Sequence, residues 1–167
     1  MRQVETFQSR ARTPGPARLS ITSVAFADGS TIPRRHTADG DDLSPRLTLG
    51  APPAGTASFA LVCEDPDAPS GLFTHWIAWN IDPATRDLPE GIPTTAPHGI
   101  RQGENGFGDT GWRGPSPPRG RPHRYVFRVI ALDAPLDLES GANRSAFDRA
   151  IEGHALAEGK LIGMYGR

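Results

Sequence analysis

The amino-acid sequence predicts a mainly β fold, a single β-sandwich domain with one or two short helices. Glycine and proline supply 19 and 17 of the 167 residues, and without any period they break the chain into short elements. Between these breaks, short segments alternate apolar and polar residues or are apolar throughout, whereas only one segment has helical spacing. A series of short strands of this kind is typical of an all-β sandwich.

Residues 19–24 alternate apolar and polar side chains and predict a half-buried strand, and residues 46–49 alternate again. Residues 160–165 are expected to close the chain as a short strand. The helix is expected over residues 144–153, where Phe147, Ala150 and Ile151 share one face, Asn143 or Ser145 caps the start and Gly153 ends it.

Three stronger runs predict the core strands, at residues 58–63, 76–81 and 125–132. Because these runs are almost continuously apolar, each strand is expected to be buried on both faces. Trp76 and Trp79 have an odd spacing, so they are expected to face opposite sides of their strand.

Residues 1–17 have no hydrophobic periodicity and contain Thr13-Pro14-Gly15-Pro16. We expect a flexible leader there, followed by one domain over residues 18–167. No apolar run approaches the ~18 residues of a membrane span, and the first residues carry no secretory signal. A lone Cys63 excludes an internal disulfide, so the cytoplasm is the expected compartment.

Charge excludes one large class of function. The chain has 18 basic and 19 acidic residues and a net charge of −1. Nucleic-acid binding relies on a basic excess, so nucleic acid is not expected as a partner.

Three polar segments lie beside the core strands and could carry chemistry. Glu64-Asp65-Pro66-Asp67-Ala68-Pro69 follows the first core run, and His75 begins the second. Gly114-Pro115-Ser116-Pro117-Pro118 precedes His123 and Tyr125 at the third. Imidazole, phenol and the backbone N–H groups of glycine suit a phosphate or carboxylate ligand.

Other interpretations stay open on the residues alone. The acidic segment can be a plain turn, and a histidine before an apolar strand can be a packed structural residue. A small hydrolase could use Asp65, His75 and His123 as base, acid and orienting group, with Ser116 as a conceivable nucleophile. The same three residues could bind a metal, although no short His-x-His pair organises them. His36 and His98 lie in polar loops and are expected to be solvated.

Several ordered blocks resemble one family. The segments DPDAP (65–69), HW…N (75–80), GWRGPSPPRGRPHRYVF (111–127) and GHALAEGKLIGMYGR (153–167) closely resemble the phosphatidylethanolamine-binding proteins. TADGDDLSP (37–45) and GIRQGENGFGDTGW (99–112) look like its other blocks. The similarity is greatest to the bacterial and archaeal branch, often called Raf kinase inhibitor-like, and covers residues 19–167.

The resemblance implies an antiparallel Greek-key β-sandwich and a non-enzymatic binding protein without a cofactor. Its shallow anion pocket would accept phosphate, acetate or a phosphoethanolamine head group, with backbone N–H groups near Gly114 completing the site. By matching motifs, the implied lining residues are Asp65, Pro69, His75, Gly114, Pro115, His123 and Tyr125.

The resemblance also implies possible partners and one backbone feature. Some eukaryotic relatives inhibit kinases or serine proteases, so a kinase or protease is an implied protein partner, and bacterial relatives are often homodimers. The family motif further implies a cis peptide bond between Ala68 and Pro69.

Overall fold

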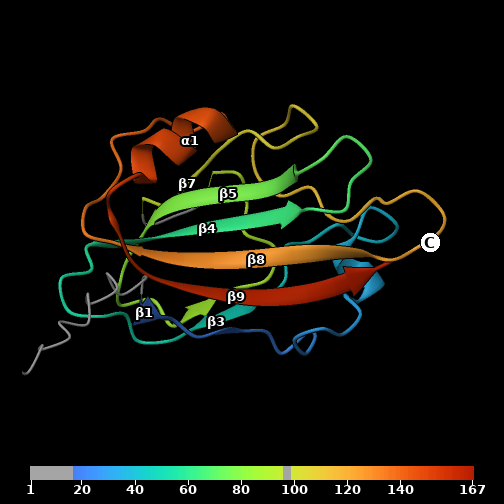
Figure 1. The fold of residues 1–167 in the computed structure, drawn as a ribbon, viewed down its shortest axis with the longest axis horizontal. Helices are drawn as coiled ribbons and strands as arrows, with labels where there is room; N and C mark the ends of the chain where they lie inside the picture. The colour runs from blue at the N-terminus through green and yellow to red at the C-terminus, as the bar shows by residue number, and fades with distance from the viewer. Residues whose placement is uncertain (1–16, 96–98) are drawn as a thin grey trace, which may run out of the picture.

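Two β-sheets packed face to face form the part of the chain that the computed structural model describes, residues 17–95 and 99–167 (Figure 1). One sheet has six strands and the other has three. The elements are β1 (Ala17–Arg18), β2 (Ile21–Thr22), the 3-10 helix η1 (Arg34–His36), β3 (Leu47–Leu49), β4 (Ser58–Asp65), β5 (Phe73–Ile81), β6 (Asp87–Leu88), β7 (Arg101–Gln102), β8 (His123–Leu132), α1 (Arg144–Ile151) and β9 (Ala155–Tyr165).

The large sheet has the order β1-β9-β8-β4-β5-β7. β5 follows β4 as its antiparallel neighbour, β7 pairs with the other side of β5, and β8 returns to lie beside β4. This is the Greek-key order, so the fold class is confirmed. The pairs in the large sheet are antiparallel except for one, because β1 runs parallel to β9.

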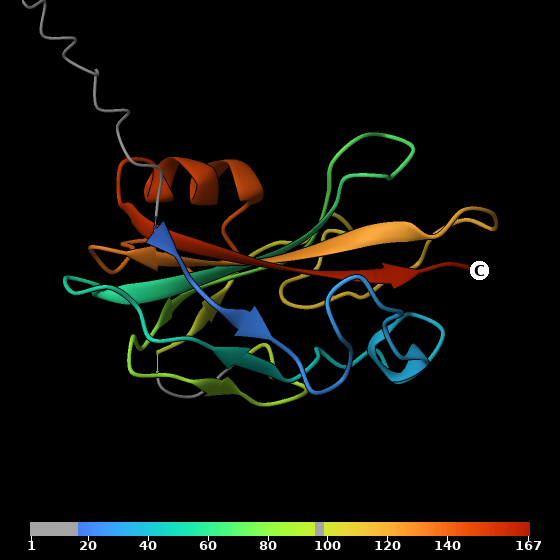
Figure 2. The ribbon, with the colours of Figure 1, turned by 60° about the horizontal axis from the view of Figure 1, so that its bottom comes forward.

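The expected core strands form the centre of the large sheet and separate two apolar layers. Phe59 and Trp76 pack against Leu47 of the small sheet between the two sheets. Trp79 lies on the opposite face and packs against Phe147 of α1. The two tryptophans therefore face opposite sides as predicted, and Figure 2 shows α1 above the large sheet with the small sheet below.

The strands extend beyond the apolar runs that predicted them. β4 continues to Asp65, β5 begins at Phe73 and β8 begins at His123. β9 spans 11 residues, longer than the expected 160–165. These polar strand ends carry the chemistry-bearing side chains and place them at one end of the sheet.

The outer edge of β9 is covered by two stretches of chain. Leu19 donates its backbone N–H to the Glu158 carbonyl beside β1. Farther along, Gly29 donates to Ile162, and Ile32 donates to Met164. Of the expected leader, residues 1–16 lie outside the described residues, and Ala17 is already paired with β9.

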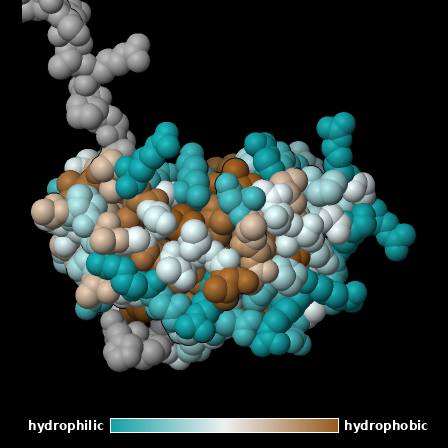
Figure 3. Space-filling model, turned by 90° about the horizontal axis from the view of Figure 1, so that it is seen from below, coloured by the Kyte–Doolittle hydropathy of each residue, from teal (hydrophilic) through white to brown (hydrophobic). Residues whose placement is uncertain are grey.

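The outside of the molecule is mixed in polarity. On the side of the small sheet, Figure 3 shows apolar areas that are interrupted by hydrophilic side chains. Among the described residues, no helix is long and apolar enough to cross a membrane.

Asn80 is the side chain that fixes the bulged end of β5. Its φ of 55° lies in the left-handed region, next to a register shift between β4 and β5. Its amide donates to the Leu136 carbonyl at 3.0 Å, and its carbonyl oxygen accepts from the Leu136 N–H at 2.7 Å. Asn tolerates this backbone conformation better than most residues, and here it also holds the segment after β8.

Replacing Asn80 tests both contributions. Asn80→Ala removes two hydrogen bonds and puts a Cβ-bearing residue without polar compensation in the left-handed region, so we expect a loss of about 2–4 kcal/mol in unfolding free energy. Asn80→Gly removes the same bonds without the steric cost and should lose less than Asn80→Ala. Urea denaturation of the three proteins checks this order, and equal stability of all three would contradict it.

Candidate functional site

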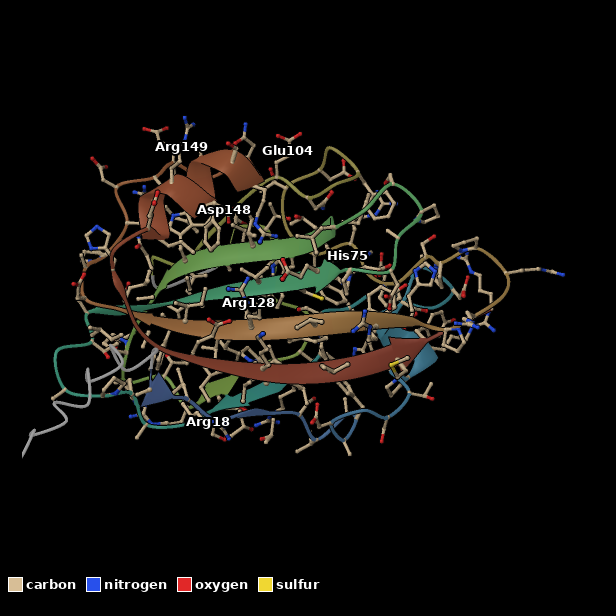
Figure 4. The ribbon with its side chains drawn as sticks, in the orientation of Figure 1. Arg18, His75, Glu104, Arg128, Asp148 and Arg149 are labelled. Carbon is tan, nitrogen blue, oxygen red and sulfur yellow. The ribbon has the colours of Figure 1, made fainter. Side chains whose placement is uncertain are left out.

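A pocket of about 280 Å³ opens at the end of the large sheet where the polar strand ends meet. Figure 4 shows His75 at this end, beside the right-hand ends of β4 and β5. The pocket is bounded by the β4–β5 loop, the loop after β7 and the segment before β8. It is lined by Asp65, Ala68, Pro69, Ser70, Phe73, His75, Phe107, Ser116, Pro117, Pro118, His123 and Tyr125.

A buried hydrogen bond between Asp65 and His123 forms the floor of the pocket. Asp65 is the last residue of β4, and its Oδ2 lies 2.7 Å from Nδ1 of His123, the first residue of β8. Both side chains are buried. Oδ1 of Asp65 accepts the backbone N–H of Asp67 at 2.7 Å. With both carboxylate oxygens bonded, Asp65 orients the imidazole and leaves Nε2 of His123 for a ligand.

The ring of His75 is oriented in a similar way, by a backbone carbonyl group. Its Nδ1 lies 2.6 Å from the Arg113 carbonyl oxygen, which requires a proton on Nδ1 and again leaves Nε2 for the pocket. Its ring packs edge-on against Tyr125, with 5.2 Å between ring centroids. Burial lowers the pKa of His75, although the Arg113 carbonyl and the Asp65 charge oppose the shift. The imidazole is therefore neutral at pH 7.

Tyr125 supplies a buried hydroxyl with no hydrogen-bond partner among the residues that the structure describes. Burial, and secondarily the Asp65 charge, raise the pKa of Tyr125 far above its ordinary value, so the phenol is protonated and can donate. Buried polar atoms nearly always have a partner. A bound ligand that accepts a hydrogen bond from the Tyr125 hydroxyl would explain why this donor has no protein partner among the described residues.

An ion pair between Asp67 and Arg124 fixes the loop that closes one side of the pocket. Asp67 accepts the guanidinium of Arg124 at 2.8 and 3.0 Å and also the Arg124 backbone N–H at 2.9 Å. These bonds with Arg124 lower the pKa of Asp67 to about 2. The β4–β5 loop is thus attached to the start of β8 by two adjacent carboxylates.

Most of the predicted site residues come together here, and two do not. Asp65, Pro69, His75, His123 and Tyr125 all line the pocket.

Gly114 and Pro115, which were predicted to line the pocket, are absent from its lining. The Gly114 N–H donates to Oδ1 of Asp42 at 2.8 Å, so it is not free to hold an anion. A Cβ at this position would lie 2.5 Å from the same oxygen. The Pro115 carbonyl accepts from Ala38. Both residues fix the segment that places Ser116 in the lining.

The expected cis bond between Ala68 and Pro69 is also wrong, because no described residue has a cis peptide bond. The loop reverses by other means. Gly71 has a φ of 102° and donates its N–H to the Ala68 carbonyl at 3.0 Å, a conformation that suits glycine.

Sequence reasoning missed the aromatic part of the lining. Phe73 lies two residues before His75 on β5 and therefore shares its face. Its ring packs against those of His75 and Phe107, with centroids 5.0 and 4.9 Å away. Counting back from His75 by the strand period of two was the signal that could have found Phe73.

The remaining expectations have mixed outcomes. Among the described residues, no three His, Cys, Asp or Glu side chains group closely enough to hold a metal ion, so the metal hypothesis has no ligand set there. His36 is buried, contrary to expectation, and its Nδ1 lies 2.8 Å from the Leu43 carbonyl oxygen. His98 lies outside the described residues. Cys63 is buried in β4, and burial raises its pKa.

Comparison with known proteins gives a consistent result. Residues 22–166 match the family model described as phosphatidylethanolamine-binding protein. The chain is 47% identical over 151 residues to a UPF0098 protein of Methanothermobacter thermautotrophicus, covering 89% of this chain and 99% of the relative. It is 38% identical to the UPF0098 protein YbhB of Escherichia coli, covering 88% and 99%.

Solved structures agree with these sequence relatives. A crystal structure described as a putative phosphatidylethanolamine-binding protein homologue, CT736 of Chlamydia trachomatis, is similar with a TM-score of 0.82 and 35% identity, covering 90% of this chain and 98% of the other. The structure of YbcL from Escherichia coli, described as a new member of the mammalian PEBP family, has a TM-score of 0.84 and 31% identity, covering 90% and 99%.

The Asp67–Arg124 pair predicts an acid-dependent loss of stability. Because the folded-state pKa of Asp67, about 2, lies below the unfolded value of about 3.9, the pair stabilises the fold above about pH 4. That contribution is lost as the pH falls toward 2. Asp67→Asn keeps an acceptor for the Arg124 N–H but removes the charge, so its unfolding free energy should fall less over this range. Denaturant titrations at several pH values check this, and parallel curves for the two proteins would contradict it.

Proposed function

The chain belongs to the phosphatidylethanolamine-binding protein family, and on that premise we propose that its pocket binds a small oxyanion. The ligand class is the phosphoryl group of a phosphoethanolamine head group, free phosphate, or a carboxylate such as acetate. One observation carries the proposal. The Tyr125 hydroxyl is buried in the pocket wall and has no partner among the residues described by the structure, and an oxyanion would accept its hydrogen bond.

The two histidines support the same ligand class. Nδ1 of His75 is bonded to the Arg113 carbonyl, and Nδ1 of His123 is bonded to Asp65. Each ring therefore offers its Nε2 to the ligand. A protonated Nε2 donates a charge-assisted hydrogen bond, which is roughly twice as strong as a neutral one.

Asp65 has a positioning role in this proposal. A free carboxylate would repel an anion, but both oxygens of Asp65 are bonded, one to His123 and one to the Asp67 N–H. Its negative charge favours the protonated form of His75. The same charge would attract the ammonium of an ethanolamine head group.

The proposal is binding without a chemical step. The Asp65–His123 pair has the geometry of a general base, but the Ser116 hydroxyl accepts a hydrogen bond from Arg167 at 3.3 Å. No Gly-x-Ser-x-Gly turn surrounds this serine. Control by a kinase or protease partner, homodimer formation and a cytoplasmic location stay predictions.

Removing the Tyr125 hydroxyl separates a ligand role from a structural role. Tyr125→Phe deletes a buried donor that has no hydrogen-bond partner in residues 17–95 and 99–167, so the unfolding free energy should stay equal or rise. Affinity for phosphoethanolamine should fall about tenfold, the value of one hydrogen bond to a charged group. Calorimetric titration measures the affinity, and thermal unfolding measures the stability. Because the proposal is binding without a chemical step, the phosphoethanolamine recovered after the titration should be unchanged. A loss of stability with full affinity would assign the hydroxyl to the fold.

Anion affinity should rise as the pH falls. Burial lowers the pKa of His75, so the free pocket holds a neutral ring whose Nε2 must take up a proton before it can donate. Sulfate is the suitable probe because its charge is constant between about pH 5 and 8. Above the pKa of His75, the affinity for sulfate can rise by up to about tenfold for each pH unit that the pH falls.

The control for this titration is His75→Asn. Asn keeps a donor for the Arg113 carbonyl but cannot be protonated, so the pH dependence should become weaker. A wild-type affinity that is flat across the range would exclude a protonated His75 from the proposed site.

A further inference from the structure

A second hollow lies close to the pocket, beyond Ser116 and Pro117. It has a volume of about 660 Å³ and is lined by Arg34, Asp39, Arg119 and Arg167, none of which lines the pocket. Arg34 begins η1, and Arg167 follows β9. Figure 2 shows η1 next to the C-terminal end of β9, at the right-hand end of the molecule. The hollow is therefore a separate feature at the same end as the pocket.

One guanidinium and the one carboxylate of this hollow are already used by the fold. Nη2 of Arg167 donates to Oδ1 of Asp39 at 2.8 Å, and its Nε lies 3.1 Å from Oδ2. The Tyr165 hydroxyl also donates to Oδ2 of Asp39. Arg167 further donates to the Pro117 carbonyl at 3.1 Å and to Ser116 Oγ at 3.3 Å. The bonds from Arg167 and Tyr165 lower the pKa of Asp39 to about 2, so this carboxylate is ionised at neutral pH.

The other two guanidiniums of the hollow, those of Arg34 and Arg119, have no carboxylate partner in the described ranges. Nε of Arg34 donates to the backbone carbonyl of Asp39 at 2.8 Å, but its terminal nitrogens bond to no described residue. Arg119 forms neither an ion pair nor a side-chain hydrogen bond with the described part of the chain. The neighbouring Arg35 differs, because its Nε lies 2.6 Å from the Glu90 carboxylate.

The hollow consequently keeps an excess of positive charge. Three guanidiniums surround one side-chain carboxylate, and the excess remains even when the terminal carboxylate of Arg167 is counted. The whole chain has a net charge of −1, so the excess is local. Like charges gathered around a hollow repel one another, and a bound anion would relieve that repulsion.

The residue type narrows the class of anion. A guanidinium is a planar fork that can donate two parallel hydrogen bonds to a phosphate or a carboxylate. Because Nε of Arg34 is used by the Asp39 carbonyl, its two terminal nitrogens are the pair left for such contacts. Two uncompensated guanidiniums match a dianion. A phosphomonoester is a dianion above its second pKa of about 6, whereas a simple carboxylate carries a single charge.

We propose that Arg34, Arg119 and Arg167 form a second anion site, which binds the dianionic phosphoryl group of free phosphate or of a small phosphomonoester. This site goes beyond the proposed function, because it shares no lining residue with the pocket that contains His75 and Tyr125. Arg167 is its fixed member, and Arg34 and Arg119 supply the uncompensated charge.

The ligand, rather than the protein, should set the pH dependence at this site. Arginine stays protonated, and Asp39 is ionised well below neutral pH. His36 of η1 is buried, with its Nδ1 bonded to the Leu43 carbonyl. Phosphomonoester affinity should therefore rise as the pH rises through about 6, and sulfate affinity should be flat between about pH 5 and 8. The pocket that contains His75 has the opposite expectation.

The test is a titration of the full chain, followed by the NMR signals of isotope-labelled arginine side chains at low ionic strength, where exposed charges are least screened. Glycerol 2-phosphate, inorganic phosphate and sulfate are the probes. We expect the signals of Arg34, Arg119 and Arg167 to shift to saturation. Saturable binding of either phosphate probe would support the site, and the tighter of the two would identify the preferred source of the phosphoryl group. The titration is repeated after replacing His75→Asn and Tyr125→Phe together, which weakens the pocket and leaves the hollow intact.

Substitution of Arg119 tests the site with little risk to the fold, because this side chain has no partner among the described residues. Arg119→Ala should lower the affinity of the hollow for glycerol 2-phosphate by about fivefold, the value of one exposed charge pair. Arg119→Lys keeps the charge but not the planar fork, so it should restore only part of the affinity. Arg149→Ala is the matched control, because it removes an exposed arginine from α1 (Figure 4) and should bind like the wild type.

The outcomes separate this inference from the proposed function. Arginine signals in the hollow that do not saturate, or that shift no more than the Arg149 signal, would overturn the second site. Shifts that disappear in the variant of His75 and Tyr125 would place the ligand in the pocket and would also overturn it. Shifts that persist in that variant and weaken in Arg119→Ala would support the second site, even if the pocket itself binds no anion.

Discussion

The buried hydrogen bond between Asp65 and His123 is the constraint on which the ligand end of this molecule depends. It joins the last residue of β4 to the first residue of β8, two strands that are paired along most of their length. In a low-dielectric interior such a bond is strong, and losing one partner leaves a costly buried group. Because Tyr125 lies two residues farther along β8, the same bond fixes where its hydroxyl lies relative to the pocket.

A second set of bonds fixes the opposite wall by a different chemistry. Asp42 accepts from the Gly114 N–H and from the Trp112 indole, at 2.8 and 3.2 Å. Glycine is required at position 114 because the carboxylate and the His36 carbonyl oxygen leave no space for a Cβ. A side chain far away in the sequence thus determines how the proline-rich wall is presented to the ligand.

The sequence predicted well what depends on neighbouring residues and predicted poorly what depends on distant ones. The buried strands were identified because apolar periodicity is a local property, but their ends were missed where Asp65 and Phe73 continue the backbone pairing. The family motifs located the histidines and Tyr125. They could not show that the Gly114 N–H is used by a carboxylate 72 residues away. His36 was misassigned for the same reason, because its burial comes from loop packing rather than from its neighbours.

The covering of β9 has a consequence for how this protein can associate. An uncovered long strand at the margin of a sheet would offer free N–H and C=O groups to another chain, the usual route to domain swapping and fibrillar aggregation. Here Leu19, Gly29 and Ile32 donate to that margin. On the other margin of the large sheet, β7 has only two residues. Continuing the large sheet past β9 into a second molecule would therefore first require peeling away part of the protein's own chain, and at β7 only a two-residue strand is available for pairing.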